Sequence, residues 1–196
     1  MPAEDSTEPD FWNSRYSAGR MPWDLGGVPA ALGPFLARAR TPGRVLIPGC
    51  GSGYEVQAFH DAGFEVTAID FSPAARERAG RILGPLKRCV IAGDFFTHDF
   101  GGQSFDVIYE RTFLCSLPLA LRPAYAKRMA ALLKTGGLLA GIFLYGEEAD
   151  PPPYPLGEAQ EHEIFDDSFE LIENEPVLDS LPLFREMERW QEWRRK

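Results

Sequence analysis

The chain has 196 residues, of which 44% are hydrophobic, and its formal net charge is -9. This length and apolar content suit one globular domain, so we expect residues 1–196 to fold as a single unit. The 20 Lys and Arg residues are scattered along an acidic chain, which disfavours a polyanion such as DNA or tRNA and indicates a small-molecule partner.

The first forty residues predict two helices joined by a turn-rich stretch. Thr7 and Asp10 have the spacing of a capping box, and Trp12 and Tyr16 then lie on one helix face. Residues 19–27 are rich in turn formers and contain Met-Pro-Trp-Asp at positions 21–24. Apolar residues then recur at helical spacing over 28–36, so this segment is expected to pack on the core.

From residue 44 the pattern alternates between strands and helices. Strands are predicted at 45–47, 64–70, 89–92, 105–110 and 138–145, and helices at 54–62, 72–84 and 123–135. Ser72 followed by Pro73 fits a helix N-cap and first helical position, and Gly136 with Gly137 is expected to end the last helix. This alternation predicts a mostly parallel sheet with helices on both faces.

The pattern changes after residue 150. Residues 150–155 read Asp-Pro-Pro-Pro-Tyr-Pro and predict an irregular loop. Residues 169–172 and 183–190 then have the character of strands with no clear helix between them, so we expect a hairpin at one edge of the sheet.

The three cysteines, Cys50, Cys89 and Cys115, fit no zinc or redox spacing, and we expect no metal site. The N-terminus is acidic rather than basic and apolar, and no apolar run approaches the roughly 20 residues of a membrane span. These features indicate a cytoplasmic protein without a membrane partner, and we expect a monomer.

A glycine-rich turn follows the first predicted strand. Residues 49–53 read Gly-Cys-Gly-Ser-Gly, so the backbone at Gly49, Gly51 and Gly53 can approach a ligand closely. The helix that follows directs free N–H groups and the positive end of its dipole at the same place. An anion belongs there, either a pyrophosphate or the carboxylate of S-adenosylmethionine. The GxGxG spacing, in place of the GxGxxG of dinucleotide enzymes, favours S-adenosylmethionine.

Two acidic residues end the next strands at the same sheet edge. Asp70 can accept hydrogen bonds from both ribose hydroxyls, or it can provide a charge at the N-terminus of the following helix. Asp94 can accept from an adenine amino group, while the N–H of Phe95 meets a ring nitrogen. Phe71 and Phe95 can sandwich the adenine, although both can equally be core residues.

Segments at residues 22–26, 45–55, 113–115 and 122–125 occur in an order that resembles the thiopurine methyltransferase superfamily, with the strongest likeness to plant and bacterial halide/thiol methyltransferases. Residues 45–55 resemble the nucleotide motif of the family, and 22–26 its Pro-Trp-Asp motif. Residues 113–115 lie in a segment similar to the family's Tyr-Thr-Phe-Phe-Cys, and 122–125, 153–154 and the Trp-rich C-terminus also match. The likeness extends from Trp12 over nearly the whole chain.

The resemblance implies a Rossmann-like class I S-adenosylmethionine-dependent methyltransferase. Its fold would be α/β, with a seven-stranded, mostly parallel sheet and helices on both faces. Residues 1–40 would form an N-terminal lid over the cofactor. It also implies that aromatic residues lie against the cofactor at Trp12, Tyr16 and Trp23, where Tyr16 replaces a tryptophan of the plant enzymes. The resemblance further implies cofactor contacts at five positions, which are Gly49, Asp70, Asp94, Phe95 and Arg111.

Arg111 is a departure from the family pattern. The plant enzymes have Asp-Tyr-Thr after the fourth strand, whereas residues 110–112 here read Glu-Arg-Thr. The guanidinium can grip an anionic substrate, or it can form an ion pair with Glu8, Glu110 or the cofactor carboxylate. We therefore count Arg111 in both the cofactor site and the substrate site.

Methyl transfer to a halide or thiolate needs no catalytic base, and we assign no residue a definite catalytic role. Alignment and a dry pocket suffice, helped by aromatic faces that attract the sulfonium. We expect Phe113, Cys115 and Tyr154 to line the substrate pocket, with Cys115 as a wall rather than a nucleophile. Tyr16 or Glu110 becomes a base only for a neutral thiol. The histidines are expected to be solvated.

Residues 150–154 resemble the Asp-Pro-Pro-Tyr motif of amino methyltransferases, but they follow the fifth strand and contain an extra proline. The main prediction is thus transfer of a methyl group to a small soft nucleophile, such as a thiol, a halide or a thiopurine. Two alternatives are a nicotinamide-dependent Rossmann oxidoreductase and a protein that binds S-adenosylmethionine without turnover.

Overall fold

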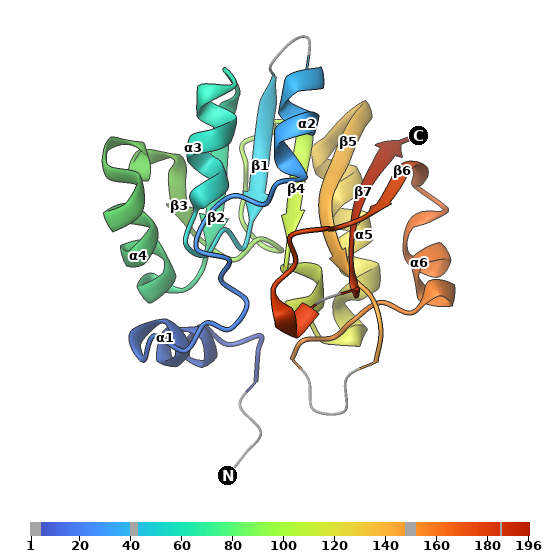
Figure 1. Cartoon of the computed structure of the whole chain (residues 1–196). Coiled ribbons are helices and arrows are strands. Elements are labelled where there is room, and N and C mark those ends of the chain that lie inside the picture. Colours follow the sequence, from blue (N-terminus) through green and yellow to red (C-terminus); the bar gives the residue numbers. More distant parts are fainter. Residues whose placement is uncertain (1–4, 40–42, 148–151, 185) are drawn as a thin grey trace.

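The computed structural model describes residues 5–39, 43–147, 152–184 and 186–196. Seven strands form one sheet in the order β3-β2-β1-β4-β5-β7-β6 (Figure 1). Their bounds are β1 (Arg44–Pro48), β2 (Glu65–Asp70), β3 (Val90–Ala92), β4 (Phe105–Arg111), β5 (Leu133–Leu144), β6 (Phe169–Pro176) and β7 (Glu188–Arg195). The first five strands pair in parallel, and β7 pairs antiparallel with both β5 and β6. The predicted α/β fold with a mostly parallel seven-stranded sheet is confirmed.

Helices cover both faces of this sheet. Their bounds are α1 (Pro9–Ser17), α2 (Leu32–Arg38), α3 (Tyr54–Asp61), α4 (Pro73–Leu83), α5 (Arg122–Leu132) and α6 (Glu158–Phe165). Buried side chains of α2, α3 and α4 belong to one core cluster, and those of α5 and α6 belong to the cluster on the opposite face. No helix in the described ranges is long and apolar enough to cross a membrane.

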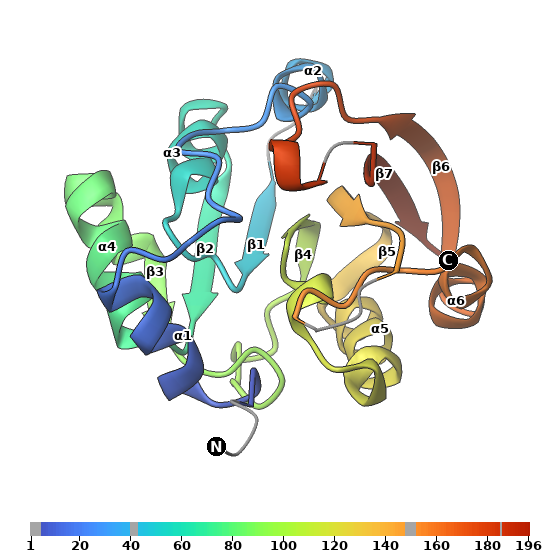
Figure 2. The ribbon, with the colours of Figure 1, turned by 60° about the horizontal axis from the view of Figure 1, so that its bottom comes forward.

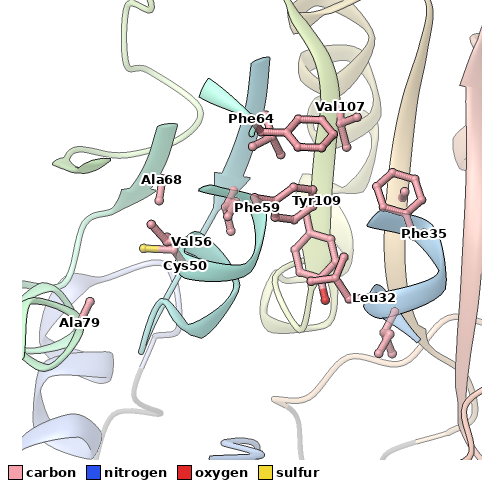
Figure 3. Packing of buried hydrophobic residues seen from close by; sticks show 14 of the residues in the cluster. Leu32, Phe35, Cys50, Val56, Phe59, Phe64, Ala68, Ala79, Val107 and Tyr109 are labelled. Atoms are coloured by element: carbon pink, nitrogen blue, oxygen red, sulfur yellow. The ribbon is translucent and has the colours of Figure 1, made fainter. Parts of the chain in front are cut away.

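Aromatic rings fill the core between the sheet and the first group of helices. The Phe59 ring on α3 meets the Tyr109 ring of β4 at 5.4 Å and the Phe35 ring of α2 at 6.4 Å, both near-perpendicular (Figure 3). All three side chains are buried, and each such burial contributes about 2 to 3 kcal/mol. This packing fixes α3, and with it the glycine turn that precedes α3.

Three predicted boundaries are wrong. Helix α1 begins at Pro9, because proline at the first helical position needs no N–H partner, and its cap residue Glu8 provides no side-chain bond. Thr7 instead binds Asp5 through its N–H (2.9 Å) and its hydroxyl (2.7 Å). Strand β5 begins at Leu133, before the two glycines expected to end the helix, because Leu133 already pairs with Phe105.

The third boundary lies in the C-terminal hairpin. The hairpin itself is confirmed, but its second strand begins at Glu188 rather than at residue 183. Residues 182–184 form a short 3₁₀ turn, closed by a bond from the Phe184 N–H to the Leu181 carbonyl, which buries the Phe184 ring. Residue 185 of the predicted strand and residues 150–151 of the predicted loop lie outside the described residues.

The parallel strands β1, β2 and β4 end at one side of the sheet, and α1 lies at this side next to α4 (Figures 1 and 2). Residues 5–31, which we call the N-terminal segment, begin here and lead to α2. In doubly wound folds this side of the sheet carries the ligand site.

Candidate active site

A cavity of about 730 Å³ opens at the carboxyl ends of β1, β2 and β4. Its volume lies in the range of sites for small molecules and cofactors. The structure brings nearly all the predicted site residues together in its lining: Trp12, Tyr16, Trp23, Gly49, Gly51, Gly53, Asp70, Phe71, Asp94, Phe95, Arg111, Phe113 and Cys115. Tyr154 is not in the lining, although Pro152 and Pro153 are.

The glycine turn forms one wall, and its glycines leave no space for side chains. A Cβ at Gly49 would lie 2.4 Å from the Phe113 ring, and one at Gly51 would lie 2.5 Å from the Tyr16 hydroxyl. Both residues also have positive φ angles, of 55° and 53°. Gly53 is the cap residue of α3, and a Cβ there would crowd Leu83 of α4 at 3.1 Å. The turn therefore needs glycine both for its conformation and for close packing.

Asp70 ends β2 with a buried carboxylate next to this turn. One oxygen accepts from the Gly51 N–H at 2.9 Å, and the other accepts from the Ser72 N–H at 2.8 Å. Burial raises the pKa of the Asp70 carboxyl, and these two hydrogen bonds oppose the rise. Each oxygen keeps capacity for a further donor, as the predicted ribose contact requires. Ser72, not Asp70, caps α4.

Asp94 and its neighbouring phenylalanines form the next part of the lining. The Asp94 carboxylate accepts from the Phe96 N–H at 2.9 Å and from the Thr97 hydroxyl at 3.1 Å. The Phe95 ring is buried and packs edge-on against the Phe96 and Phe113 rings, which favours its interpretation as a core residue. Phe71 is only half-buried at the cavity.

Aromatic side chains from the N-terminal segment close the cavity on another side. The Trp23 ring meets the Trp12 ring at 5.5 Å and the Tyr16 ring at 6.1 Å, both near-perpendicular. Trp23 also packs on the small core cluster that contains Cys115 and Phe184. Burial and the nearby Asp70 charge raise the pKa of the Tyr16 hydroxyl, so Tyr16 stays protonated at neutral pH.

Polar contacts that were not predicted from the sequence attach the N-terminal segment to the rest of the site. One Asp24 oxygen accepts from the Ser52 hydroxyl at 2.7 Å and from the Arg78 guanidinium at 3.1 Å. The Asn13 side-chain carbonyl accepts from the Ser72 hydroxyl at 2.7 Å. The only sequence signals for these contacts were the aspartate of Pro-Trp-Asp and the serine within the glycine turn.

Arg111 forms an ion pair, but with a different partner from those expected. Its Nη1 lies 3.5 Å from a Glu188 oxygen, and the two side chains are 11% and 1% exposed. Arg111 Nη1 and Glu188 Oε2 have no hydrogen-bond partner in the described residues. Glu188 was missed because it lies far from Arg111 in the sequence, and only the pairing of β5 with both β4 and β7 brings the two side chains together. Neither Glu8 nor Glu110 is the ion-pair partner.

Glu110 has a structural role instead. One of its oxygens accepts from the Phe113 and Leu114 N–H groups at 2.8 and 2.9 Å, and the other accepts from the Tyr125 hydroxyl at 2.7 Å. These bonds fix the turn that holds Phe113 against Gly49. Burial raises the pKa of the Glu110 carboxyl to about 7. Glu110 is not in the cavity lining, so it is not placed to act as a base.

We expect Glu110→Gln to remove a pH dependence of stability. The carboxyl has a pKa of about 7 in the folded protein against 4.5 when free, so its contribution is complete below pH 4.5 and is lost as the pH rises through 7. Glutamine keeps the two backbone contacts without the buried charge. Urea unfolding from pH 4.5 to 8 should show the free energy of unfolding of the parent falling relative to the variant, by on the order of 3 kcal/mol. If the free energy of unfolding had the same pH dependence in the parent and in the variant, this prediction would be contradicted.

Another part of the cavity lining is an apolar wall, whose Phe113 ring packs against Gly49 of the glycine turn. It combines the segment after β4 with two segments from the C-terminal third, and its members are Phe113, Cys115, Leu117, Leu121, Pro152, Pro153, Leu183 and Phe184. Burial raises the pKa of the Cys115 thiol, so the thiol is neutral and does not act as a nucleophile. The Tyr154 N–H donates to the Cys115 carbonyl, so Tyr154 supports this wall through its backbone.

Three comparisons with known proteins agree with this geometry. The family model of thiopurine S-methyltransferase matches residues 7–196. A probable thiol methyltransferase of Arabidopsis thaliana is 30% identical over 190 residues, which cover 92% of this chain and 84% of the relative. A thiopurine S-methyltransferase of Xanthomonas campestris is 29% identical over 200 residues, which cover 90% and 91%.

The solved structure of a magnesium protoporphyrin IX methyltransferase from Synechocystis shares the fold, with a TM-score of 0.76, 19% identity and complete coverage of both chains. These findings confirm the prediction of a class I methyltransferase that depends on S-adenosylmethionine. The chain belongs to the thiopurine S-methyltransferase family.

Proposed function

We propose that this enzyme transfers a methyl group from S-adenosylmethionine to a small thiol or a similarly soft nucleophile, such as a halide or a thiopurine. The observation that carries the proposal is the apolar wall, where the one titratable side chain, Cys115, is a neutral thiol. With no base at this wall, the acceptor must arrive as an anion or as a group that ionises easily. Thiolates and halides meet this requirement.

The relatives support the same chemistry. Those with about 30% identity are named as a probable thiol methyltransferase and a thiocyanate methyltransferase, and those slightly below as thiopurine S-methyltransferases. Each of these names describes a small sulfur compound as the acceptor.

The residues present fit S-adenosylmethionine. The backbone of Gly49 and Gly51 makes a cradle that any Cβ would fill. The buried Arg111 Nη1 still lacks a hydrogen-bond partner in the described part of the chain, and a cofactor carboxylate would provide one. Asp70 has remaining acceptor capacity for ribose hydroxyls, and Asp94 has the same for the adenine amino group.

When bound, S-adenosylmethionine provides a methyl group on a positively charged sulfur. Trp12, Tyr16 and Trp23 present aromatic rings to the cavity, and such rings attract a desolvated cation by about 1 to 2 kcal/mol. The N-terminal segment and the apolar wall exclude water, which favours reaction of a soft anion in line with the methyl group. We infer that the chain contributes orientation and desolvation rather than acid–base catalysis.

Arg111 does not provide a free positive charge for the acceptor. Glu188 lies 3.5 Å from its guanidinium, and Glu55 also lines the cavity and interacts electrostatically with Arg111. Two carboxylates thus already offset one guanidinium. This balance favours the ion-pair interpretation of Arg111 and argues against strong selection for anionic acceptors.

A panel of acceptors tests the proposal. Purified enzyme with S-adenosylmethionine is mixed with an aromatic thiol, an aliphatic thiol, a thiopurine, iodide and a phenol of matched shape, and methylated product is measured by mass spectrometry. We expect turnover of the sulfur compounds and iodide, with the phenol at least tenfold slower because no base removes its proton. Faster methylation of the phenol would overturn the assignment.

The same preparation distinguishes the alternatives. A nicotinamide-dependent enzyme would be stabilised by NAD and not by S-adenosylhomocysteine, whereas a binder without turnover would be stabilised by S-adenosylhomocysteine and methylate nothing on the panel. A ligand at about 100 times its dissociation constant adds about 2.7 kcal/mol, which a melting curve detects readily.

We further propose that the enzyme acts in the cytoplasm as a monomer, without a nucleic-acid partner. The three cysteines are all free, as a reducing compartment favours, and the net charge of -9 disfavours polyanions.

A further inference from the structure

Helix α5 begins with a buried cation. Arg122 is the first residue of the helix, is only 3% exposed and is not part of the cavity lining. Burial removes its guanidinium from water, and the helix dipole disfavours a positive charge at a helix N-terminus. Within the described ranges, no ion pair joins Arg122 to a carboxylate. A cation at such an unfavourable place is stabilised by its hydrogen bonds, so their targets matter.

The hydrogen bonds of Arg122 go to one loop and to the helix that follows it. Its Nη2 donates to the carbonyls of Tyr154 and Pro155, at 2.8 Å each. Its Nη1 donates to the side-chain carbonyl of Gln160, in the first turn of α6. One guanidinium therefore attaches α5 to residues 152–155, which we call the proline loop, and to α6.

The proline loop forms part of the apolar wall. Pro152 and Pro153 line the cavity, and the next residue, Tyr154, donates its N–H to the Cys115 carbonyl at 2.6 Å. Cys115 lines the cavity from the segment after β4. The bonds from Arg122 are made one and two residues after these prolines, so they help to fix where the prolines lie relative to Cys115.

A second arginine of the same helix holds a different loop in the same way. Arg128 Nε donates to the Phe95 carbonyl at 3.1 Å, and its Nη2 donates to the His98 carbonyl. Phe95 and the preceding Asp94 line the part of the cavity that is expected to bind adenine. Six positions correspond to about 240° of helix rotation, so the side chains of Arg122 and Arg128 leave α5 in different directions. The helix thus attaches one loop of the apolar wall and one loop of the expected adenine site.

We propose that Arg122 is a positioning residue for the methyl acceptor, which acts by fixing the proline loop in the apolar wall, and that Arg128 fixes the cofactor side of the cavity. This inference rests on the proposed function, because it takes the apolar wall as the binding surface of the acceptor. Neither arginine lines the cavity, so each acts through the loop that it holds. Loss of one arginine should therefore disturb one substrate and spare the other.

Steady-state kinetics of two matched variants test this separation. The acceptor is benzenethiol, and each KM is measured with the other substrate saturating. For Arg122→Met we expect the KM for benzenethiol to rise about tenfold or more, the usual effect of losing charged hydrogen bonds, while the KM for S-adenosylmethionine stays within about threefold of the parent value. For Arg128→Met we expect the reverse. Methionine keeps much of the apolar stem of arginine and removes the donors.

A general loss of stability does not distinguish the two substrates. An equal rise of both KM values in Arg122→Met, or no rise in either, would therefore overturn the proposal. If Arg122→Met does not fold, Arg122→Lys decides the question, because lysine keeps the charge but lacks the planar fork that reaches three oxygens. The lysine variant should raise the KM for benzenethiol alone, by about two- to fivefold, and parent values for both substrates would count against Arg122.

Failure of the proposed function gives a different result. In that case the parent protein methylates neither benzenethiol nor any other acceptor of the panel. If only the present inference fails, the parent methylates benzenethiol, and the Arg122 variants show no selective rise in the KM for the acceptor.

Discussion

Asp70→Ala is expected to abolish most of the thermal stabilisation that S-adenosylhomocysteine gives. The carboxylate holds the glycine turn through the Gly51 N–H and the start of α4 through the Ser72 N–H, and we expect it to bind the ribose as well. Loss of these charged contacts should weaken binding at least a hundredfold. With ligand at 100 times the parent dissociation constant, stabilisation should fall from about 2.7 to about 0.4 kcal/mol.

Melting curves measure this effect, since about 2.7 kcal/mol corresponds to a shift of roughly 5 to 10 °C in a chain of this size. The shift is taken relative to each variant without ligand, so a general loss of stability does not affect the comparison. An undiminished shift for Asp70→Ala would refute the ribose assignment. Asp99→Ala serves as a control, because Asp99 is exposed, lies outside the cavity lining and, among the described residues, accepts a hydrogen bond from the Gly101 N–H of its own loop.

The parallel half of the fold was predictable because its signals are local. One continuous stretch of sequence contains most of these signals. They are the strand at 45–47, the glycine turn, the strand that ends at Asp70, and the helix cap at Ser72 and Pro73. Each depends on residues a few positions apart, so periodicity and capping rules apply directly. The cofactor side of the cavity follows from these elements.

The C-terminal third was harder to predict because its structure depends on distant contacts. Helix α6 was missed, since it is acidic and short and buries only Glu161 and Phe165. Strand β7 was placed too early because Leu183 and Phe184 are apolar, yet they form a turn that lines the cavity. The ion pair of Arg111 with Glu188 depends on the pairing of β5 with both β4 and β7, so local pattern could not reveal it.

The site also depends on side chains with no chemical signature of their own. Asn13, Ser52 and Arg78 are ordinary surface residue types, and only the fold brings them to Asp24 and Ser72. Glu55 was visible in the sequence as a charge after the glycine turn, but its burial was not. Polar groups of this kind gain significance only when their partners, or the absence of partners in the described chain, are known.

Asp24→Ala is expected to loosen the N-terminal segment and weaken cofactor binding by about ten- to thirtyfold. Asp24 is 10% exposed and joins this segment to Ser52 of the glycine turn and to Arg78 of α4. Its loss removes the side-chain contacts that attach the residue next to Trp23 to the glycine turn and to α4. Each charged hydrogen bond of this type contributes about 1.5 to 3 kcal/mol, and Asn13 still holds α1.

Limited trypsin digestion measures the loosening, because Arg20 is an exposed cleavage site within the segment. Cleavage there should be faster in the Asp24 variant, and S-adenosylhomocysteine at a concentration that saturates the variant should restore the parent rate, since a closed segment covers the bound cofactor. Glu77→Ala is the matched control: it removes the exposed ion pair with Arg81 on the same helix without touching the segment. Equal cleavage rates in parent and Asp24 variant would show that aromatic packing alone keeps the N-terminal segment closed.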